Sequence, residues 1–341
     1  MGEMLKNVFM LIMYYSGVLG LMVYGMSKIR NNHHAGILFY HRFSEHPVDG
    51  CELPHLDIEE FRKQMRHVRK WYNVITMDEL VDRLAKGGRF SSPSIVITID
   101  DGYLNNYTEA YPVLKKLSIP AMIYLSTGFI GTEDSTWVDD LMDMIKVSKK
   151  KTIKVPELLS DEPLDISTSG RKMQVFETIF NRMLSLKHEK KLALMKKLRD
   201  ILCVEESLRD VSDRRMLNWN EVIEMKQNNI DFGAHTISHP TLSKMELEQA
   251  RREIYKSKEE IENRLGCNVS HFAIPNGKKE DFSEELKGYC KEIGLKTVAS
   301  TEPGVVSAQS DPHFLRRINF PAPIHVFAFK LARNMFFHRT K

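Results

Sequence analysis

One stretch, residues 95–125, limits the possible folds of this chain more than any other. It begins with Ile95–Ile99, five β-branched residues in a row, which is typical of a strand buried on both faces within a parallel sheet. An Asp-Asp-Gly sequence follows, then a helical pattern and a second apolar run at 121–125. Strand, helix and strand at this spacing predict a βαβ unit, with the two aspartates at the carboxyl end of a parallel strand, where α/β folds hold their catalytic groups. Asp-Asp-Gly is also an ordinary turn sequence, so the motif alone has a structural explanation as well.

Composition bounds the class of protein. The chain has 341 residues, of which 42% are apolar, and it can bury a large core as one domain or as a domain with an insertion. The net charge is only +4, and no basic stripe is interleaved with aromatic residues, so nucleic acid is not an expected partner. The four cysteines form no Cys-x-x-Cys pair, which argues against a zinc knuckle or a redox motif.

The amino terminus carries an apolar segment. Residues 7–27 contain no charged side chain, and a segment of about 20 residues is long enough to span a bilayer. We expect residues 1–30 to form a membrane anchor or a membrane-associated helix, although a helix packed on the domain would explain the same pattern. A signal peptide is disfavoured because no small-x-small cleavage site follows. The flanking charges leave the orientation open, and a location at the bacterial cell envelope is the expectation.

The remaining residues, 31–341, predict one α/β barrel domain with a helical insertion at about 140–213. Strand and helix patterns alternate on both sides of the insertion, which is itself rich in Lys, Glu, Leu and Met. The charge runs of the insertion are expected to be solvated helix faces, with a lid over the substrate as the alternative. Two capping boxes, Thr76–Glu79 and Ser243–Glu246, predict the starts of two helices.

A second group of polar side chains follows another predicted strand. His235 and His239 come directly after the apolar run at 230–234, and the spacing of the pair alone is weak evidence. Two strand ends of one barrel would bring both imidazoles to the same rim as Asp101. Two histidines and one carboxylate are a usual catalytic zinc set, which would leave Asp100 free to act as a base.

Three motifs carry a resemblance to a known family. The run Thr98–Tyr103 resembles the Thr-Phe-Asp-Asp-Gly motif of the polysaccharide deacetylases, the NodB-homology proteins of carbohydrate esterase family 4. His235–Pro240 is similar to the second motif of that family, and Phe272–Gly277 to a variant of the third. The likeness extends over residues 36–320.

The resemblance implies a fold, a reaction and a set of site residues. The fold is a distorted (β/α)7 barrel, and the reaction is hydrolysis of an N-acetyl group on an amino sugar. By resemblance, a divalent metal, most often Zn²⁺, is held by Asp101, His235 and His239, and Asp100 is the general base. The backbone N–H of Tyr103 would stabilise the oxyanion, and Pro275 and Asn276 would lie beside the substrate.

The sequence departs from the family pattern in two places. Ala273 stands where many members have the arginine that orients the base, and we expect Arg316 or Arg317 to replace it, with Arg316 as the first candidate. The late Leu-x-His motif, which supplies the general acid, is not recognisable. His41 and His325 are the candidates for that acid.

These observations predict a membrane-associated, metal-dependent hydrolase that removes N-acetyl groups from a cell-surface or exported polysaccharide. Its expected partners are an N-acetylated polysaccharide or oligosaccharide and a membrane. Two alternatives stay open: a catalytically weak carbohydrate-binding relative, and an esterase for O-acetyl groups, whose better leaving group needs the acid less.

Overall fold

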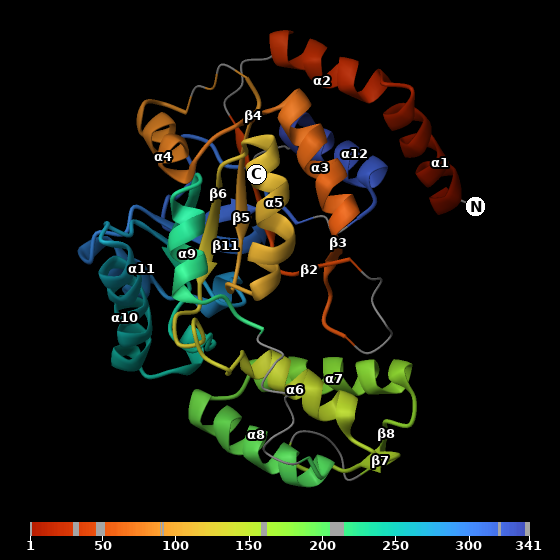
Figure 1. Ribbon diagram of the computed structural model, residues 1–341, viewed down its shortest axis with the longest axis vertical. Helices are drawn as coiled ribbons and strands as arrows, with labels where there is room; N and C mark the ends of the chain where they lie inside the picture. Colours follow the sequence, from red (N-terminus) through yellow and green to blue (C-terminus); the bar gives the residue numbers. More distant parts are fainter. Residues whose placement is uncertain are drawn as a thin grey trace.

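The computed structural model describes residues 2–29, 34–45, 52–88, 90, 92–157, 162–204, 215–319 and 322–337. Its centre is a sheet of parallel strands that is nearly closed into a barrel and surrounded by helices (Figure 1). A second group of helices lies at one end of this barrel, at the bottom of the view in Figure 1.

The barrel has a continuous path of seven strands. In spatial order they are β1 (Ala35–Tyr40), β5 (Ser94–Ile99), β6 (Ala121–Leu125), β9 (Ile230–Ala234), β10 (His271–Ala273), β11 (Thr297–Pro303) and β12 (Leu315–Arg317). A parallel bridge between Leu38 and Ile318 joins the last strand to the first, and the Phe39 N–H donates to the Ile318 carbonyl at 3.1 Å. A further strand, β4 (Asn73–Val74), pairs with the start of β5. The predicted distorted barrel of seven strands is therefore confirmed.

Strand β5 explains why its sequence is apolar at every position. All six residues are buried, because alternate side chains point to opposite faces and both faces are covered. Ile95, Ile97 and Ile99 pack in the core between sheet and helices, whereas Val96 packs in the barrel interior. The same alternation directs the side chain of Asp100 into the mouth of the barrel.

Helices surround the barrel on its outside. They are α3 (Ile58–Trp71), α4 (Met77–Ala85), α5 (Tyr111–Leu117), α9 (Trp219–Lys226), α10 (Leu247–Leu265), α11 (Glu284–Glu292) and α12 (Ile324–Phe337). The predicted capping box at Thr76–Glu79 is present with both of its hydrogen bonds. The one predicted at Ser243–Glu246 is wrong. Ser243 lies in a 3₁₀ turn, which buries Leu242 and is closed by the Met245 N–H on the Leu242 carbonyl, so α10 begins only at Leu247.

The amino-terminal apolar segment is two helices rather than one. α1 (Gly2–Tyr15) and α2 (Val18–Ile29) meet at an angle of 72°, and Gly17 between them has φ +79°, a conformation that glycine adopts freely. Their inner sides pack against α12 and α3, where Met10, Leu19 and Val23 are buried. In the described part of the chain, no single helix is long and apolar enough to cross a bilayer; the bent pair is, by length and composition alone.

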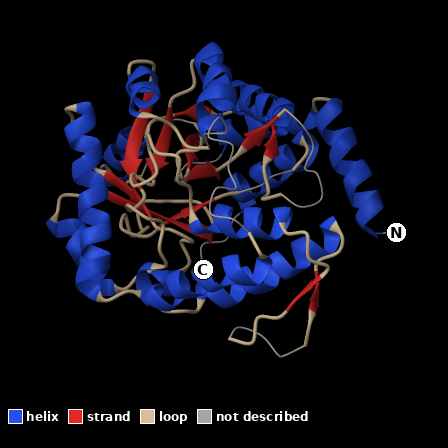
Figure 2. Cartoon of the chain, turned by 60° about the horizontal axis from the view of Figure 1, so that its bottom comes forward, coloured by secondary structure: helices blue, strands red, loops and turns tan. Residues whose placement is uncertain are grey.

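The insertion has a hydrophobic core of its own. Its elements are α6 (Trp137–Val147), a hairpin of β7 (Thr152–Ile153) and β8 (Leu164–Asp165), α7 (Ser169–Leu184) and α8 (His188–Leu202). Their apolar side chains form a cluster that is separate from the barrel cores and begins at Trp137; the predicted end near residue 213 lies outside the described residues. Figure 2 shows the β7–β8 hairpin projecting from the insertion, and a second short pair, β2 (Phe43–Ser44) and β3 (Leu56–Asp57), beside the barrel.

Candidate active site

Polar side chains gather where the barrel strands end. Asp100 and Asp101 follow β5, His235 follows β9, Arg317 ends β12 and His41 follows β1. Because the carboxyl ends of parallel strands meet at one edge, strands far apart in the sequence bring these groups together. All of them except His41 are buried.

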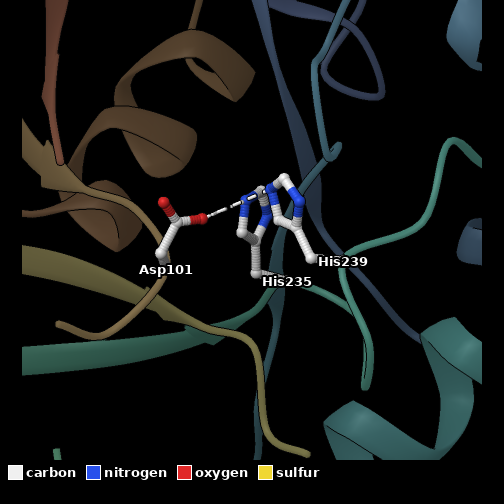
Figure 3. A group of neighbouring side chains, drawn as sticks. All are labelled: Asp101, His235 and His239. Atoms are coloured by element: carbon white, nitrogen blue, oxygen red, sulfur yellow. Dashed lines mark ion pairs between the residues drawn. The ribbon is translucent and has the colours of Figure 1, made fainter. Parts of the chain in front are cut away.

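Asp101, His235 and His239 point toward one another (Figure 3). The Nε2 atoms of the two histidines lie 3.3 Å from the same carboxylate oxygen, Oδ1 of Asp101, and the three possible ligand atoms all lie within 4.8 Å of one another. That buried oxygen has no hydrogen-bond partner within the described residues. An oxygen left without a partner between two imidazole nitrogens fits a divalent metal ion, and two nitrogens with one oxygen suit Zn²⁺ with coordination positions open.

The charge states of the three residues suit a cation. Burial opposes ionisation of Asp101, but the nearby histidines outweigh it and hold the pKa of this carboxyl below its usual range. Burial lowers the pKa of His239 to about 4, which keeps the imidazole in the neutral form that binds metals. Burial also opposes charge on His235, yet the neighbouring carboxylates of Asp101 and Asp100 raise its pKa; a metal ion bound here would take the place of the proton that they favour.

Neighbouring groups fix the His235 imidazole and the loop that carries His239. The Nδ1 atom of His235 lies 2.7 Å from the Ala273 carbonyl oxygen, which leaves Nε2 facing Asp101. The loop between the histidines is held by Glu253 of α10, whose carboxylate accepts the Ile237 and Ser238 N–H groups at 2.8 and 2.9 Å. The sequence analysis missed Glu253, because a glutamate on a helix rich in Lys and Glu looks like a solvated residue.

Strained backbone is concentrated in the same loops. Asp101, Thr236, His239 and Asn276 all have positive φ, from +51° to +78°. Residues other than glycine adopt this region at a cost, and such positions cluster at functional sites. Gly102, next to Asp101, also has a positive φ, and a Cβ there would lie 2.8 Å from a Leu125 methyl carbon.

Asp100 is held by an arginine from β12. Arg317 donates from Nη1 to Oδ1 at 2.8 Å and from Nη2 to Oδ2 at 2.7 Å, a bidentate pair with both side chains buried. Burial opposes ionisation of Asp100, but the Arg317 charge and hydrogen bonds lower the pKa of this carboxyl, so it is ionised. Arg316, the first candidate from the sequence, is exposed and lies against Gly304, because alternate residues of a strand point to opposite faces. The guanidinium therefore comes from Arg317 and not from Arg316.

The two candidate acids lie in different places. The Nε2 atom of His41 is 3.7 Å from Oδ2 of Asp100, and the side chain is 39% exposed toward the cavity described below. His325 lies in the first turn of α12 on the outside of the barrel, where Nε2 is 2.8 Å from Oδ1 of Asn7 in α1. The structure thus brings His41 to the site and keeps His325 away from it.

Tyr103 stands at the start of the helix that follows β5, where backbone N–H groups lack helical acceptors. Its hydroxyl donates to the buried Asp139 of α6 at 3.0 Å, and the same carboxylate pairs with Arg42 and Arg215. This cluster links the rim of the barrel to the insertion.

A cavity of about 680 Å³ lies over these groups. It is lined by Asp100, Asp101, both metal-site histidines, His41, Tyr103 and Asn276 on the barrel side, and by α7 on the side of the insertion. The Asn276 amide donates to Thr241 Oγ1 at 3.3 Å. Pro275 is buried, and its neighbours Ile274 and Asn276, rather than Pro275 itself, face the cavity.

Two solved structures have a similar fold. The Streptococcus pyogenes deacetylase PplD, solved with acetate, has a TM-score of 0.58 at 17% identity and covers 89% of this chain and 98% of its own. IcaB from Ammonifex degensii has a TM-score of 0.57 at 17% identity, with the same two coverages.

Sequence comparisons agree with the fold. YxkH of Bacillus subtilis (strain 168), a protein assigned by name to the polysaccharide deacetylases, is 22% identical over 282 residues, which are 83% of this chain and 70% of YxkH. The family model described as polysaccharide deacetylase matches residues 87–166 and 171–298, more than half of the chain and all of the strand ends from Asp100 to His239. The chain therefore belongs to the polysaccharide deacetylase family.

Proposed function

We propose that the protein is a metal-dependent hydrolase that removes N-acetyl groups from amino sugars of a cell-surface or exported polysaccharide. One observation carries this proposal: the ligand set of Asp101, His235 and His239 lies beside an ionised carboxylate, Asp100, at the floor of a cavity. A ligand set adjacent to a separate base is what metal-assisted hydrolysis requires.

Each residue has a role that follows from its position. A divalent ion bound at the ligand set would supply Lewis-acid chemistry, lowering the pKa of a water molecule and polarising the acetyl carbonyl. Asp100 accepts a proton from the attacking water, and Arg317 keeps this carboxylate ionised and fixed in direction.

Two further groups act on the other atoms of the amide. The Tyr103 N–H donates to the oxygen on which negative charge develops. One such donor typically stabilises the transition state by about 3 kcal/mol. His41 is the group we assign to proton delivery to the leaving amine, because it lies at the rim, 3.7 Å from Asp100, and is open to the cavity. An acid at this place favours amide hydrolysis over ester hydrolysis, since an alkoxide leaves more easily than an amide anion.

The test is acetate release from a panel of N-acetylated and O-acetylated glycans, with and without a chelator. We expect release from the N-acetylated glycans, its loss with chelator and its return with added Zn²⁺. Asp100→Asn removes basicity at nearly constant shape, so it should keep the bound metal and lose about 10²- to 10⁴-fold in turnover. Asp101→Ala should lose the metal itself. A parent protein that releases no acetate would leave only the binding-module alternative, and an Asp100→Asn variant as fast as an active parent would rule out Asp100 as the general base.

We also propose that the α1–α2 segment lies on a membrane surface. Its outer side exposes large apolar side chains, among them Leu5, Ile12 and Leu21, which are 57–66% exposed. Lys6 and Lys28 stand near its two ends, where they can contact anionic lipid headgroups. The 72° bend and the inner side packed on the barrel favour a pair of helices that lies in the interface over one that spans the bilayer.

A further inference from the structure

The cavity over the metal-site residues has a second wall that does not belong to the barrel. On one side are the strand ends with Asp101 and His239, and on the other is helix α7 of the insertion. A volume of about 680 Å³ falls in the range of pockets that enclose most of a drug-sized ligand, which is about the size of a disaccharide. The cavity is thus larger than an acetylated sugar unit at the metal site would fill.

Helix α7 packs one face into the core of the insertion and turns the adjoining face toward the cavity. Val175, Ile179 and Met183 are buried in the core of the insertion. A second stripe faces the cavity at the spacing of one helix face, and its members are Met173, Phe176, Glu177, Phe180, Asn181 and Leu184. Phe176 is buried in the core, Met173, Phe180 and Leu184 are half-buried against it, and the Glu177 carboxylate and the Asn181 amide are exposed.

This stripe is fixed relative to the catalytic loops. The ring of Phe180 stacks on Trp137, with centroids 5.5 Å apart and an interplanar angle of 13°. The ammonium group of Lys191 lies 4.3 Å from the centroid of the Trp137 ring and donates to Thr241 Oγ1 at 3.1 Å. Thr241 stands two residues after His239 and also accepts the Asn276 amide. A continuous set of contacts therefore connects α7 to the loops that carry the metal-site and substrate-side residues.

We propose that this stripe of α7 is a second sugar subsite, which binds the unit next to the acetylated one and so selects oligosaccharides or chain ends over monosaccharides. The inference rests on the proposed deacetylase function. A pyranose ring presents C–H groups on its faces and hydroxyls at its edge, and the stripe offers Phe180, Met173 and Leu184 for the first and Glu177 and Asn181 for the second. Contacts to a non-reacting sugar that are the same in the ground state and the transition state act through KM, and we expect this of the stripe because it lies away from the reacting atoms.

The experiment compares N-acetylated amino-sugar oligosaccharides of one to four units. For the parent, kcat/KM should rise from the monosaccharide to the disaccharide. Phe180→Ala should lower the ratio of disaccharide to monosaccharide kcat/KM about 10-fold, through KM, as expected for the loss of one aromatic contact. Glu177→Ala, at an exposed position that folding does not need, should lower the same ratio. The matched control is Leu192→Ala, an exposed apolar residue of α8 in the same insertion, which should leave the ratio within about twofold of the parent.

Calorimetric affinities for the same oligosaccharides give a readout that does not depend on turnover. If the parent releases no acetate, the proposed function fails, and the subsite still stands if the disaccharide binds the parent and binds Phe180→Ala and Glu177→Ala more weakly. If both variants keep the parental ratio and affinity, as Leu192→Ala should, the proposal of a sugar subsite on α7 is overturned.

Discussion

At the scale of single residues, side chains alternate between the two faces of the three-residue strand β12, and this alternation determines which arginine reaches the site. Leu315 and Arg317 of β12 point into the barrel, and Arg316 between them points to solvent. Arg317 also donates from Nε to the Ser300 carbonyl at 2.6 Å and from Nη1 to Thr98 Oγ1 at 3.2 Å, so its guanidinium is fixed on several sides. A side chain held in this way gives the paired carboxylate one direction and one charge state.

The two neighbouring arginines give a matched test. Arg317→Gln should leave Asp100 as a buried carboxylate without its counter-charge, which destabilises the fold by roughly 3–5 kcal/mol and slows acetate release by about 10²-fold or more. Arg316→Gln removes the same charge from an exposed position, and both quantities should stay near the parental values. Urea unfolding and acetate release measured on both variants check this. Equal losses in the two variants would contradict the assignment of Arg317.

Sequence motifs identified some of the site residues and not others, for a physical reason. The end of an apolar strand can be recognised in the sequence, and such ends are directly followed by Asp100 and Asp101 and by the His235–His239 pair. Arg317 depends on the register of a strand too short to recognise, and Asp139 and Glu253 act from helices through contacts that only the packed chain creates. His325 and Arg316 were plausible by residue type alone, because sequence gives no direction for their side chains.

At the scale of elements, hydrophobic periodicity predicted most helices and strands of the barrel. In α3 (Ile58–Trp71) the apolar residues Phe61, Met65 and Val68 recur at helical spacing and are buried, and the Thr76–Glu79 capping box starts α4. The strands β2, β3, β7 and β8 have two residues each and leave no periodic pattern to detect. The capping box at Ser243 failed because burial of Leu242 in a 3₁₀ turn outweighs a local helix-start signal.

The α1–α2 segment is predicted to bind the protein to anionic membranes. A chain that begins at Asn31 should stay in solution when anionic vesicles are floated on a density gradient, whereas the full chain should rise with them, since its exposed apolar side chains gain burial in the interface. Replacing Leu5 and Ile12 by serine should reduce flotation of the full chain, and Glu3→Ser, on the same helix, should not. Equal recovery of the full and shortened chains in the soluble fraction would remove the membrane proposal.

At the scale of the whole molecule, the insertion and the amino-terminal helices extend a barrel that closes by itself. The insertion packs its own core around Trp137, and buried Asp139 ties it to the barrel rim through Tyr103 and Arg42. The amino-terminal helices cover α3 and α12 on another side (Figure 1). The active-site cavity lies between barrel and insertion, so the relative position of these two parts sets its shape.

The layer between α3 and α1 contains a histidine that makes stability depend on pH. His67 is buried on α3, with its ring centroid 5.6 Å from that of Tyr14 in α1 and 6.1 Å from that of Tyr72. Burial, and to a smaller extent the charge of Lys70, lowers the pKa of His67 from 6.5 to about 4. Between these values the unfolded chain binds a proton that the folded chain excludes, so the free energy of unfolding must fall as the pH falls from 6.5 toward 4.

The last prediction isolates this contribution. His67→Phe keeps a ring of similar size and has no proton to bind, so its unfolding free energy should fall less than that of the parent when the pH is lowered from 7 to 4.5. The difference between the two proteins should be about 2 kcal/mol, from a pKa of 6.5 in the unfolded chain and about 4 in the folded one. Urea unfolding of both proteins at the two pH values measures it, and the other titrating groups cancel because the pair shares them. If the unfolding free energies of the two proteins fall by the same amount, His67 binds a proton in the folded state as readily as in the unfolded one. The layer between α3 and α1 must then be open to water around His67.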